Sequence, residues 1–316
     1  MTFSIVGRSV DGESWGVAVA SKFLAVGSAV PAAVAGVGAI ATQADANVAY
    51  KGLALAHLDD GATASVAVNR LLEEDEGRED RQVGIVDVDG GSATYTGSGC
   101  FDWAGGITGE GVAIQGNILV GPQVVERMKA AWDDSGEQPL ARRLLAALSA
   151  GDAAGGDRRG RQSAALLVVR EEAGYAGQDD IAVDLRVDDH GAPVTELARL
   201  LDLNDLYLTA STDAEKVPVT PELAEELEQR ARALGHDAFH AWVGSENYEM
   251  RVDQGRAPGW VDQRVLDVLR ASGGRAASAS DSGRAASASD SGRAASASER
   301  VETRVETRVE TPEDPE

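Results

Sequence analysis

The first two dozen residues constrain the fold more than any other stretch, because they read as a β-hairpin. Two apolar runs, at residues 3–6 and 16–20, flank the turn-forming segment SVDGES. Short apolar runs on either side of such a turn are typical of paired antiparallel strands. We therefore expect the sheet to begin at residue 2, directly after the first methionine.

Thr2 would then open that strand, and its side chain carries a hydroxyl. Because this side chain is small, we expect Met1 to be removed, which gives Thr2 a free α-amine as well. A hydroxyl is a weak nucleophile at neutral pH, and an α-amine, which titrates at about 7.7–8.0, can accept its proton. Thr2 is therefore a candidate nucleophile that contains its own base. The alternative is that Thr2 is simply a strand residue, since threonine is common in strands.

Over about residues 1–210, the chain resembles the domain-of-unknown-function 1028 family (DUF1028). The stretches that carry the resemblance are MTFSIVGR, GVAVASKFLAVGSAVPAAVAGVGAIATQADAN, GCFDWAGG, QGNILVGP, AGGDRRGRQSAALLVVRE and VDLRVDDH. That family is assigned to the N-terminal nucleophile (Ntn) hydrolase superfamily, which includes the proteasome β-subunits. The resemblance implies an α+β fold, a four-layer αββα sandwich with the nucleophile on its first strand. It implies no substrate.

The chain is strongly acidic, with 52 Asp and Glu residues against 29 Lys and Arg residues and a formal net charge of −23. Such a surface repels nucleic acid and anionic lipid, so we expect neither as a partner. Acidic residues spread through the chain, with few lysines, are typical of a salt-adapted cytoplasmic protein. The chain contains one cysteine, Cys100, and it contains no apolar stretch of about 18 residues, the length of a membrane-spanning helix. We therefore expect no internal disulfide, no metal or other cofactor, no membrane span and no export signal.

The apolar and turn-forming residues predict layers of paired strands and paired helices rather than βαβ crossovers. Residues 25–43 are apolar and rich in glycine, which suits strands and turns better than a helix, and residues 97–117 read as a glycine-rich loop. The other expected elements are helices at 47–59, 62–74, 123–132, 140–150 and 194–210, a hairpin at 81–87 and 93–96, and paired strands at 163–170 and 181–187.

Three further segments follow this Ntn-hydrolase-like domain at residues 1–210. Residues 211–220 form a polar linker. Residues 221–272 have helical periodicity, and the segments ELAEELEQRARALG, HDAFHAWVGSENYEMR and GWVDQRVLDVLRAS resemble a peptidoglycan-binding-like domain often appended to this family. Residues 273–316 repeat GRAASASDS and then RVET. Because this tail contains almost no apolar bulk, we expect it to be disordered.

A threonine nucleophile also needs groups that keep its amine neutral and stabilise the developing oxyanion. Lys22 follows the second expected strand and could lower the pKa of the amine, although a lysine at a strand end is commonly solvated. Asn117 is the preferred oxyanion or substrate donor. The other candidates are polar side chains among small or apolar residues, and they could equally be structural: Gln43, Asp45 and Asn47 in TQADAN, Arg161, Gln162 and Ser163 in GRQSA, and Asp102 and Trp103 at the pocket mouth.

Two functions from different classes follow from these features. The first is an Ntn amidohydrolase that acts on a small amide or peptide through Thr2. The second is a catalytically silent protein of the same fold that binds a ligand or acts as a scaffold. The expected partners are a small-molecule or peptide substrate and further copies of the chain in a homo-oligomer.

Overall fold

The computed structural model describes residues 2–255 and 257–282. Its contacts divide the chain into two compact units. Within the described residues, the first comprises residues up to 219 together with 243–263, and the second comprises 220–242 and 264–282. The domain boundaries expected from the sequence, at residues 210, 220 and 272, stay a prediction.

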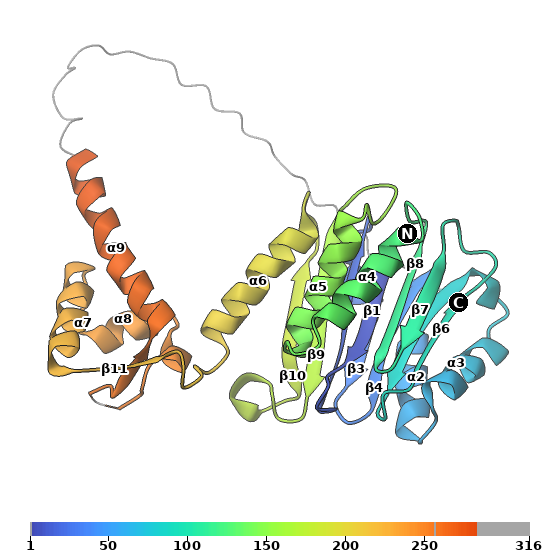
Figure 1. Ribbon diagram of the computed structural model, residues 1–316, viewed down its shortest axis with the longest axis horizontal. Coiled ribbons are helices and arrows are strands. Elements are labelled where there is room, and N and C mark those ends of the chain that lie inside the picture. The colour runs from blue at the N-terminus through green and yellow to red at the C-terminus, as the bar shows by residue number, and fades with distance from the viewer. Residues whose placement is uncertain (1, 256, 283–316) are drawn as a thin grey trace, which may run out of the picture. The chain divides into compact units, whose positions relative to one another are not determined.

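The first unit is built on two antiparallel sheets (Figure 1). The larger sheet has the strand order β10-β9-β2-β1-β8-β7, so the N-terminal strand β1 is an interior strand with β2 on one side and β8 on the other. The smaller sheet has the order β3-β4-β5-β6. The larger sheet comprises β1 (Thr2–Arg8), β2 (Ser14–Ser21), β7 (Gly105–Gly109), β8 (Val112–Asn117), β9 (Ser163–Arg170) and β10 (Ile181–Val187), and the smaller one β3 (Pro31–Val34), β4 (Gly38–Ala44), β5 (Arg81–Asp87) and β6 (Ser92–Thr96).

Helices cover the outer face of each sheet (Figure 1). Alternate residues of β1 point to opposite faces, so that Phe3 and Ile5 pack with the helices on the larger sheet while Val6 packs against the smaller sheet. Three helices bury apolar residues on the larger sheet, namely α4 (Gln123–Asp134), α5 (Leu140–Ala153) and α6 (Pro193–Tyr207), and two do so on the smaller sheet, namely α2 (Tyr50–Asp59) and α3 (Ala64–Glu73).

The layer between the two sheets changes character along the strands. Near the β1–β2 turn it is apolar, with Val6, Val17 and Val86 among the buried residues. Toward the start of β1 it becomes polar although it stays buried. The polar side chains of this end, all at most 6% exposed, are Thr2, Ser4, Ser21, Gln43, Gln82, Gln115, Asn117 and Ser163. A buried polar layer needs a partner for each of its groups, and this one lies where the candidate nucleophile was expected.

Two expectations from the sequence are corrected. Residues 97–117 are not a loop throughout, because they contain the strands β7 and β8. Glycine in β7 allows close approach: a Cβ on Gly106 would lie 2.8 Å from both the Ile114 carbonyl oxygen and the Thr94 hydroxyl. Residues 25–43 also contain a single helical turn, α1 (Val26–Ala29), beside the expected strands.

Beyond α6, the described residues form short strands, a 3-10 turn and three further helices. In the first unit, Arg251 is 1% exposed and binds the Asp262 carboxylate at 2.8 Å and the Leu206 carbonyl at 3.1 Å. The elements of this part are β11 (Lys216–Pro218), α7 (Pro221–Ala233), α8 (Phe239–Ser245), β12 (Trp260–Asp262), α9 (Gln263–Ser282) and a 3-10 turn at Glu249–Arg251.

The last helix departs from the expectation for the tail. α9 continues to Ser282, past the predicted boundary at residue 272 and through the first GRAASASDS repeat. The rest of the tail, residues 283–316, lies outside the described residues. Among the helices in the described ranges, none is long and apolar enough to cross a membrane.

Candidate functional site

Four polar residues form a row across the larger sheet at the start of β1. Thr2 pairs with Asn117 of β8 on one side and with Ser21 of β2 on the other. Ser21 pairs in turn with Ser163 of β9. Side chains that pair directly across neighbouring strands lie on the same face, so all four point toward the smaller sheet. The antiparallel register thus brings together residues that are far apart in the sequence.

The Thr2 hydroxyl lies in this row and is 6% exposed as a residue. Its Oγ1 atom is 3.2 Å from Oγ of Ser21, and either hydroxyl could donate. The Thr2 carbonyl oxygen is 3.4 Å from Nε2 of Gln43, which reaches it from the smaller sheet. Thr2 is therefore held by both sheets. Its side chain contacts Ser21 of the larger sheet, and its carbonyl oxygen contacts Gln43 of the smaller sheet.

A network of side-chain amides connects the two sheets beside Thr2. Gln82 accepts hydrogen bonds from Nε2 of Gln43 at 2.8 Å and from Nδ2 of Asn117 at 2.9 Å. Ser4, two residues along from Thr2, donates to Oε1 of Gln43 at 2.7 Å and accepts from Nε2 of Gln115 at 2.7 Å. These groups satisfy one another, so the polar layer is ordered rather than loosely solvated.

The groups that contact the side chain and the carbonyl of Thr2, the Ser21 hydroxyl and the Gln43 amide, are neutral. Among the described residues, no carboxylate, imidazole or ammonium group is recorded as a partner of the Thr2 side chain. Lys22, the expected modulator of the amine, follows directly after Ser21, but its side chain is exposed. Its backbone N–H instead donates to the buried carboxylate of Asp157 at 2.8 Å. The structure therefore places the Lys22 side chain on the surface and not in the row.

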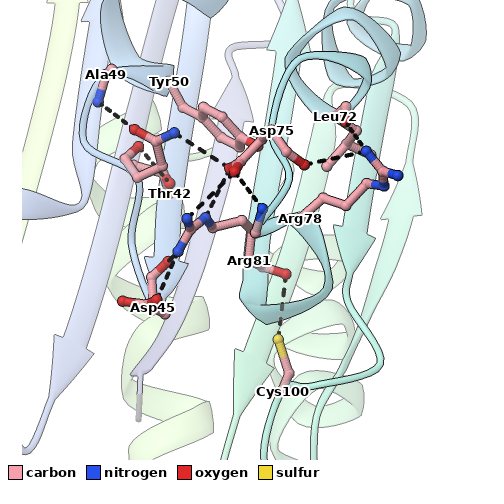
Figure 2. Close-up of polar contacts among 11 residues, drawn as sticks. Thr42, Asp45, Ala49, Tyr50, Leu72, Asp75, Arg78, Arg81 and Cys100 are labelled. Atoms are coloured by element: carbon pink, nitrogen blue, oxygen red, sulfur yellow. Dashed lines mark hydrogen bonds and ion pairs between the residues drawn. The ribbon is translucent and has the colours of Figure 1, made fainter.

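Asp45 and Asn47 belong to a different cluster, centred on Asp75 (Figure 2). Arg81 donates to the Asp75 carboxylate at 2.9 Å and to the Asp45 carboxylate at 2.8 Å. Asn47 donates to Asp75 at 3.4 Å, and Tyr50 does so at 2.7 Å. The cluster lies on the helix-covered side of the smaller sheet, because Arg81 alternates with Gln82, which faces the larger sheet.

Charge and burial shift the ionisation of this cluster. The Arg81 hydrogen bond, with further donors including Tyr50, holds the pKa of Asp75 well below its usual range. Burial, together with the neighbouring Asp75, raises the pKa of the Tyr50 hydroxyl. Asp75 is thus a charged anchor for the loops that precede α2 and β5.

Among the GRQSA candidates, Ser163 lies two strands away from Thr2, at about 10 Å given the spacing of neighbouring strands. Ser163 donates to the Phe23 carbonyl at 2.5 Å and accepts from the Val26 N–H at 3.1 Å, so it holds the loop after β2. Arg161 binds the Asp152 carboxylate at 2.7 Å. Gln162 donates from its side chain to Asp189 at 3.1 Å.

The remaining candidates lie in the loop between β6 and β7. Asp102 is exposed, and Trp103 is half-buried against the core of the larger sheet. The Trp103 carbonyl accepts from the Leu119 N–H at 3.0 Å, which ties this loop to the segment after Asn117. Cys100 is partly buried, and its thiol donates to the Arg81 carbonyl at 3.3 Å (Figure 2). Burial raises the pKa of that thiol.

Sequence reasoning missed three residues that the fold brings to this end of the sheets. Ser21 and Gln82 touch Thr2 or its partners, and Asp157 holds the backbone of Lys22 and Arg159. A small hollow of about 10 Å³, the size of about one water molecule, lies beside Ser21 and Asp157. Ser21 is the last residue of β2 and directly precedes Lys22, so its position at the strand end could have identified it as a candidate. Nothing local in the sequence distinguishes Gln82.

Comparison with known proteins places the chain in a family. The family model described as "Family of unknown function (DUF1028)" matches residues 2–197. A crystal structure of a DUF1028 protein from Silicibacter pomeroyi is 32% identical, with a TM-score of 0.59, covering 67% of this chain and 90% of that one. The Anbu (ancestral beta-subunit) protein from Yersinia bercovieri is 10% identical with a TM-score of 0.31, covering 64% of this chain and 94% of that one. No curated protein matches. The chain belongs to the DUF1028 family of unknown function.

Proposed function

We propose that the protein is an amidohydrolase of the Ntn-hydrolase type, with a four-layer αββα sandwich and with Thr2 as nucleophile once residue 1 is removed. The observation that carries the proposal is the setting of Thr2. Its hydroxyl is buried at the end of an interior strand, 3.2 Å from the Ser21 hydroxyl and across from the Asn117 amide. Buried hydroxyls and amides around a potential nucleophile are suited to acyl transfer.

The proposed reaction uses groups of the chain alone. Oγ1 of Thr2 attacks the carbonyl carbon of an amide, and its proton passes to the free α-amine of Thr2. The C–N bond of the substrate then breaks, and the ammonium group returns the proton to the leaving amine. Water hydrolyses the ester that remains on Thr2. The reference pKa of an α-amine, about 7.7–8.0, leaves part of it neutral at physiological pH without help from Lys22.

A catalytically silent protein of the same fold is the second candidate, and one observation favours it. In the described part of the chain, the recorded partners of the Thr2 side chain and carbonyl are neutral. Neutral hydroxyls and amides can bind a polar ligand without carrying out chemistry on it. The experiment below distinguishes the two candidates.

The test is covalent labelling of Thr2 in the purified full chain. Periodate cleaves the Cα–Cβ bond of an N-terminal threonine only when its α-amine is free, so the intact mass reports whether Thr2 is the exposed terminus. p-Nitrophenyl acetate, a small acyl donor, should then add an acetyl group to Thr2, as read from the mass of the N-terminal peptide. Retention of residue 1, or an acetylated amine, would remove the enzyme proposal in this form.

Three variants complete the experiment. Thr2→Ala should abolish acetylation and should cost about 1 kcal/mol in unfolding free energy, because it removes the buried hydroxyl that contacts Ser21 but leaves the chain folded. Thr2→Ser should keep part of the reactivity, since hydroxyl and amine are both present. Thr42→Ala is the matched control, because Thr42 is fully buried but bonds the Asn47 carbonyl on the other face of β4. A free Thr2 that is never acetylated would support the ligand-binding candidate.

A further inference from the structure

The side-chain amide of Gln82 lies between backbone carbonyls on one side and two other amides on the other. Its Nε2 atom is 2.8 Å from the Gly116 carbonyl oxygen and 3.4 Å from that of Gly105. A carbonyl oxygen can only accept a hydrogen bond, so the atom that faces both carbonyls must be the nitrogen. The surroundings therefore decide which way this amide points, a choice that is ambiguous for many glutamines.

The orientation of Gln82 determines that of its neighbours. Its Oε1 atom can only accept, and it lies 2.9 Å from Nδ2 of Asn117 and 2.8 Å from Nε2 of Gln43. Both neighbours must therefore present their NH₂ groups to Gln82. The oxygen of the Gln43 amide then accepts from the Ser4 hydroxyl at 2.7 Å, which agrees with this order.

One N–H of Asn117 remains unused. A side-chain amide has two N–H donors and one acceptor oxygen, and within the described residues the Asn117 side chain bonds Gln82 alone, so the second N–H and Oδ1 are both open to a ligand. Asn117 is 1% exposed and is the direct partner of Thr2 across the sheet. An unused donor on so buried a side chain points to a ligand atom as its acceptor, because leaving it unpaired is costly.

The backbone beside Asn117 is also constrained. Ile118 has a φ of +51°, a left-handed conformation that is rare for a β-branched residue. Its N–H donates to the Phe101 carbonyl at 2.9 Å, and its carbonyl accepts from the Arg158 N–H at 3.2 Å. Strained backbone of this kind is concentrated at functional sites and is held there by its surroundings. Asn117 is thus fixed from its backbone by Ile118 and from its side chain by Gln82.

We propose that Gln82 is a positioning residue, which turns the Asn117 amide so that its NH₂ group, and not its oxygen, faces Gln82 and leaves the second N–H for a ligand bound at Thr2. The directions of the hydrogen bonds among Gln82, Gln43 and Asn117 follow from the contacts alone. Their consequence for catalysis rests on the proposed function. In that reaction the free N–H would stabilise the negative oxygen of the tetrahedral intermediate. An amide turned the other way would place its oxygen there and repel that charge.

The first experiment measures solvent exchange of the Asn117 side-chain NH₂ protons by NMR on the full chain. The pair of NH₂ signals that is absent from the spectrum of Asn117→Leu belongs to Asn117. In the parent, one proton should exchange slowly because it bonds Gln82, and the other at least tenfold faster. In Gln82→Met, which removes donor and acceptor at similar volume, the slow proton should exchange about tenfold faster than in the parent. Thr42→Ala is the matched control, because Thr42 is equally buried but bonds the Asn47 carbonyl on the other face of β4, and it should change this exchange less than twofold.

Equal exchange of the two protons in the parent would overturn the proposal, even if Gln82→Met failed to fold. Unchanged exchange in a folded Gln82→Met would do the same. The second experiment compares acetylation of Thr2 by p-nitrophenyl acetate, which we expect to slow about tenfold in Gln82→Met and not in Thr42→Ala. If Thr2 of the parent is not acetylated, the proposed function fails, while the exchange data still decide whether Gln82 orients Asn117.

Discussion

The hydroxyl oxygens of Thr2 and Ser21 lie 3.2 Å apart on directly paired positions of two interior strands. Ser21→Ala removes this contact and leaves the Thr2 hydroxyl with one fewer polar neighbour. We expect a loss of about 1 kcal/mol in unfolding free energy, as for one hydrogen bond, and slower acetylation of Thr2. Urea unfolding and the mass assay measure the two effects. Ser28→Ala, at an exposed serine bonded to the Ala25 carbonyl, should leave the acetylation rate unchanged.

Gly84 makes room for one member of the amide network. A Cβ at this position would lie 1.9 Å from Oε1 of Gln115. Gly84→Ala should therefore displace the Gln115 side chain from Ser4 and Thr94, at a cost of roughly 1–3 kcal/mol in unfolding free energy. Gly52→Ala is an informative control, since Gly52 lies exposed in α2 with no atom within 4 Å of the added Cβ. That change should stabilise by about 0.5–1 kcal/mol, and a loss at both sites would contradict this account.

Asp75 should make the free energy of unfolding depend on pH. Its pKa is lower in the folded protein than in the unfolded chain, where it is about 3.9. Its stabilising contribution is therefore fully present above about pH 4 and declines as the pH falls toward the folded value. Asp75→Asn should destabilise by roughly 2 kcal/mol at pH 7, and the difference from the parent should shrink below about pH 4.

Denaturant unfolding at several pH values measures the Asp75 effect. Glu110→Gln removes one negative charge from an exposed position in the β7–β8 turn, so it corrects for the change in net charge. If Asp75→Asn and Glu110→Gln differ from the parent equally at every pH, the contacts around Asp75 do not contribute as the geometry indicates.

Arg251 and Asp262 form a buried ion pair, with side chains 1% and 0% exposed. Arg251→Met would remove the Arg251 cation from the buried Asp262 carboxylate, and breaking a buried ion pair in this way typically costs about 3–5 kcal/mol. Arg251→Met combined with Asp262→Leu should recover much of that loss, because both charges are then removed. Melting of the single and double variants, with Arg70→Met on the exposed face of α3 as control, measures the coupling. Equal destabilisation by the single and double variants would contradict it.

Net charge predicts a response to salt. With a formal charge of −23, self-repulsion opposes the compact state, and salt shortens its range from about 30 Å at 0.01 M to about 3 Å at 1 M. We expect the melting temperature to rise over this range of sodium chloride. A melting temperature that stays level or falls would indicate that surface ion pairs contribute more than repulsion costs.

Local sequence patterns were sufficient for most of the fold. The N-terminal hairpin, the hairpin of β5 and β6 and the strands β9 and β10 all follow from apolar runs bounded by turns. β7 and β8 were missed, because glycine in a segment usually indicates a loop. There it permits close packing instead, as at Gly106.

The candidate site was only partly accessible from the sequence. Thr2, Asn117 and Gln43 could be picked out as polar residues among apolar ones, and the fold brings these three together. Ser21 and Gln82 could not, since their role depends on strand register and on packing of one sheet against the other. The peptidoglycan-binding-like resemblance of residues 221–272 stays a prediction.

The Arg251 contacts have a consequence for synthesis of the chain on the ribosome. Arg251 and Asp262 bind the Leu206 carbonyl and the Ser211 hydroxyl, and the intervening residues 220–242 belong to the other unit. The two sheets can assemble as soon as β10 has emerged, but the last turn of α6 gains its buried partners only when residue 262 has been translated. A nascent chain that has emerged only as far as residues 220–250 therefore presents the two sheets with the end of α6 still lacking its buried partners, which is where a chaperone or protease would meet it.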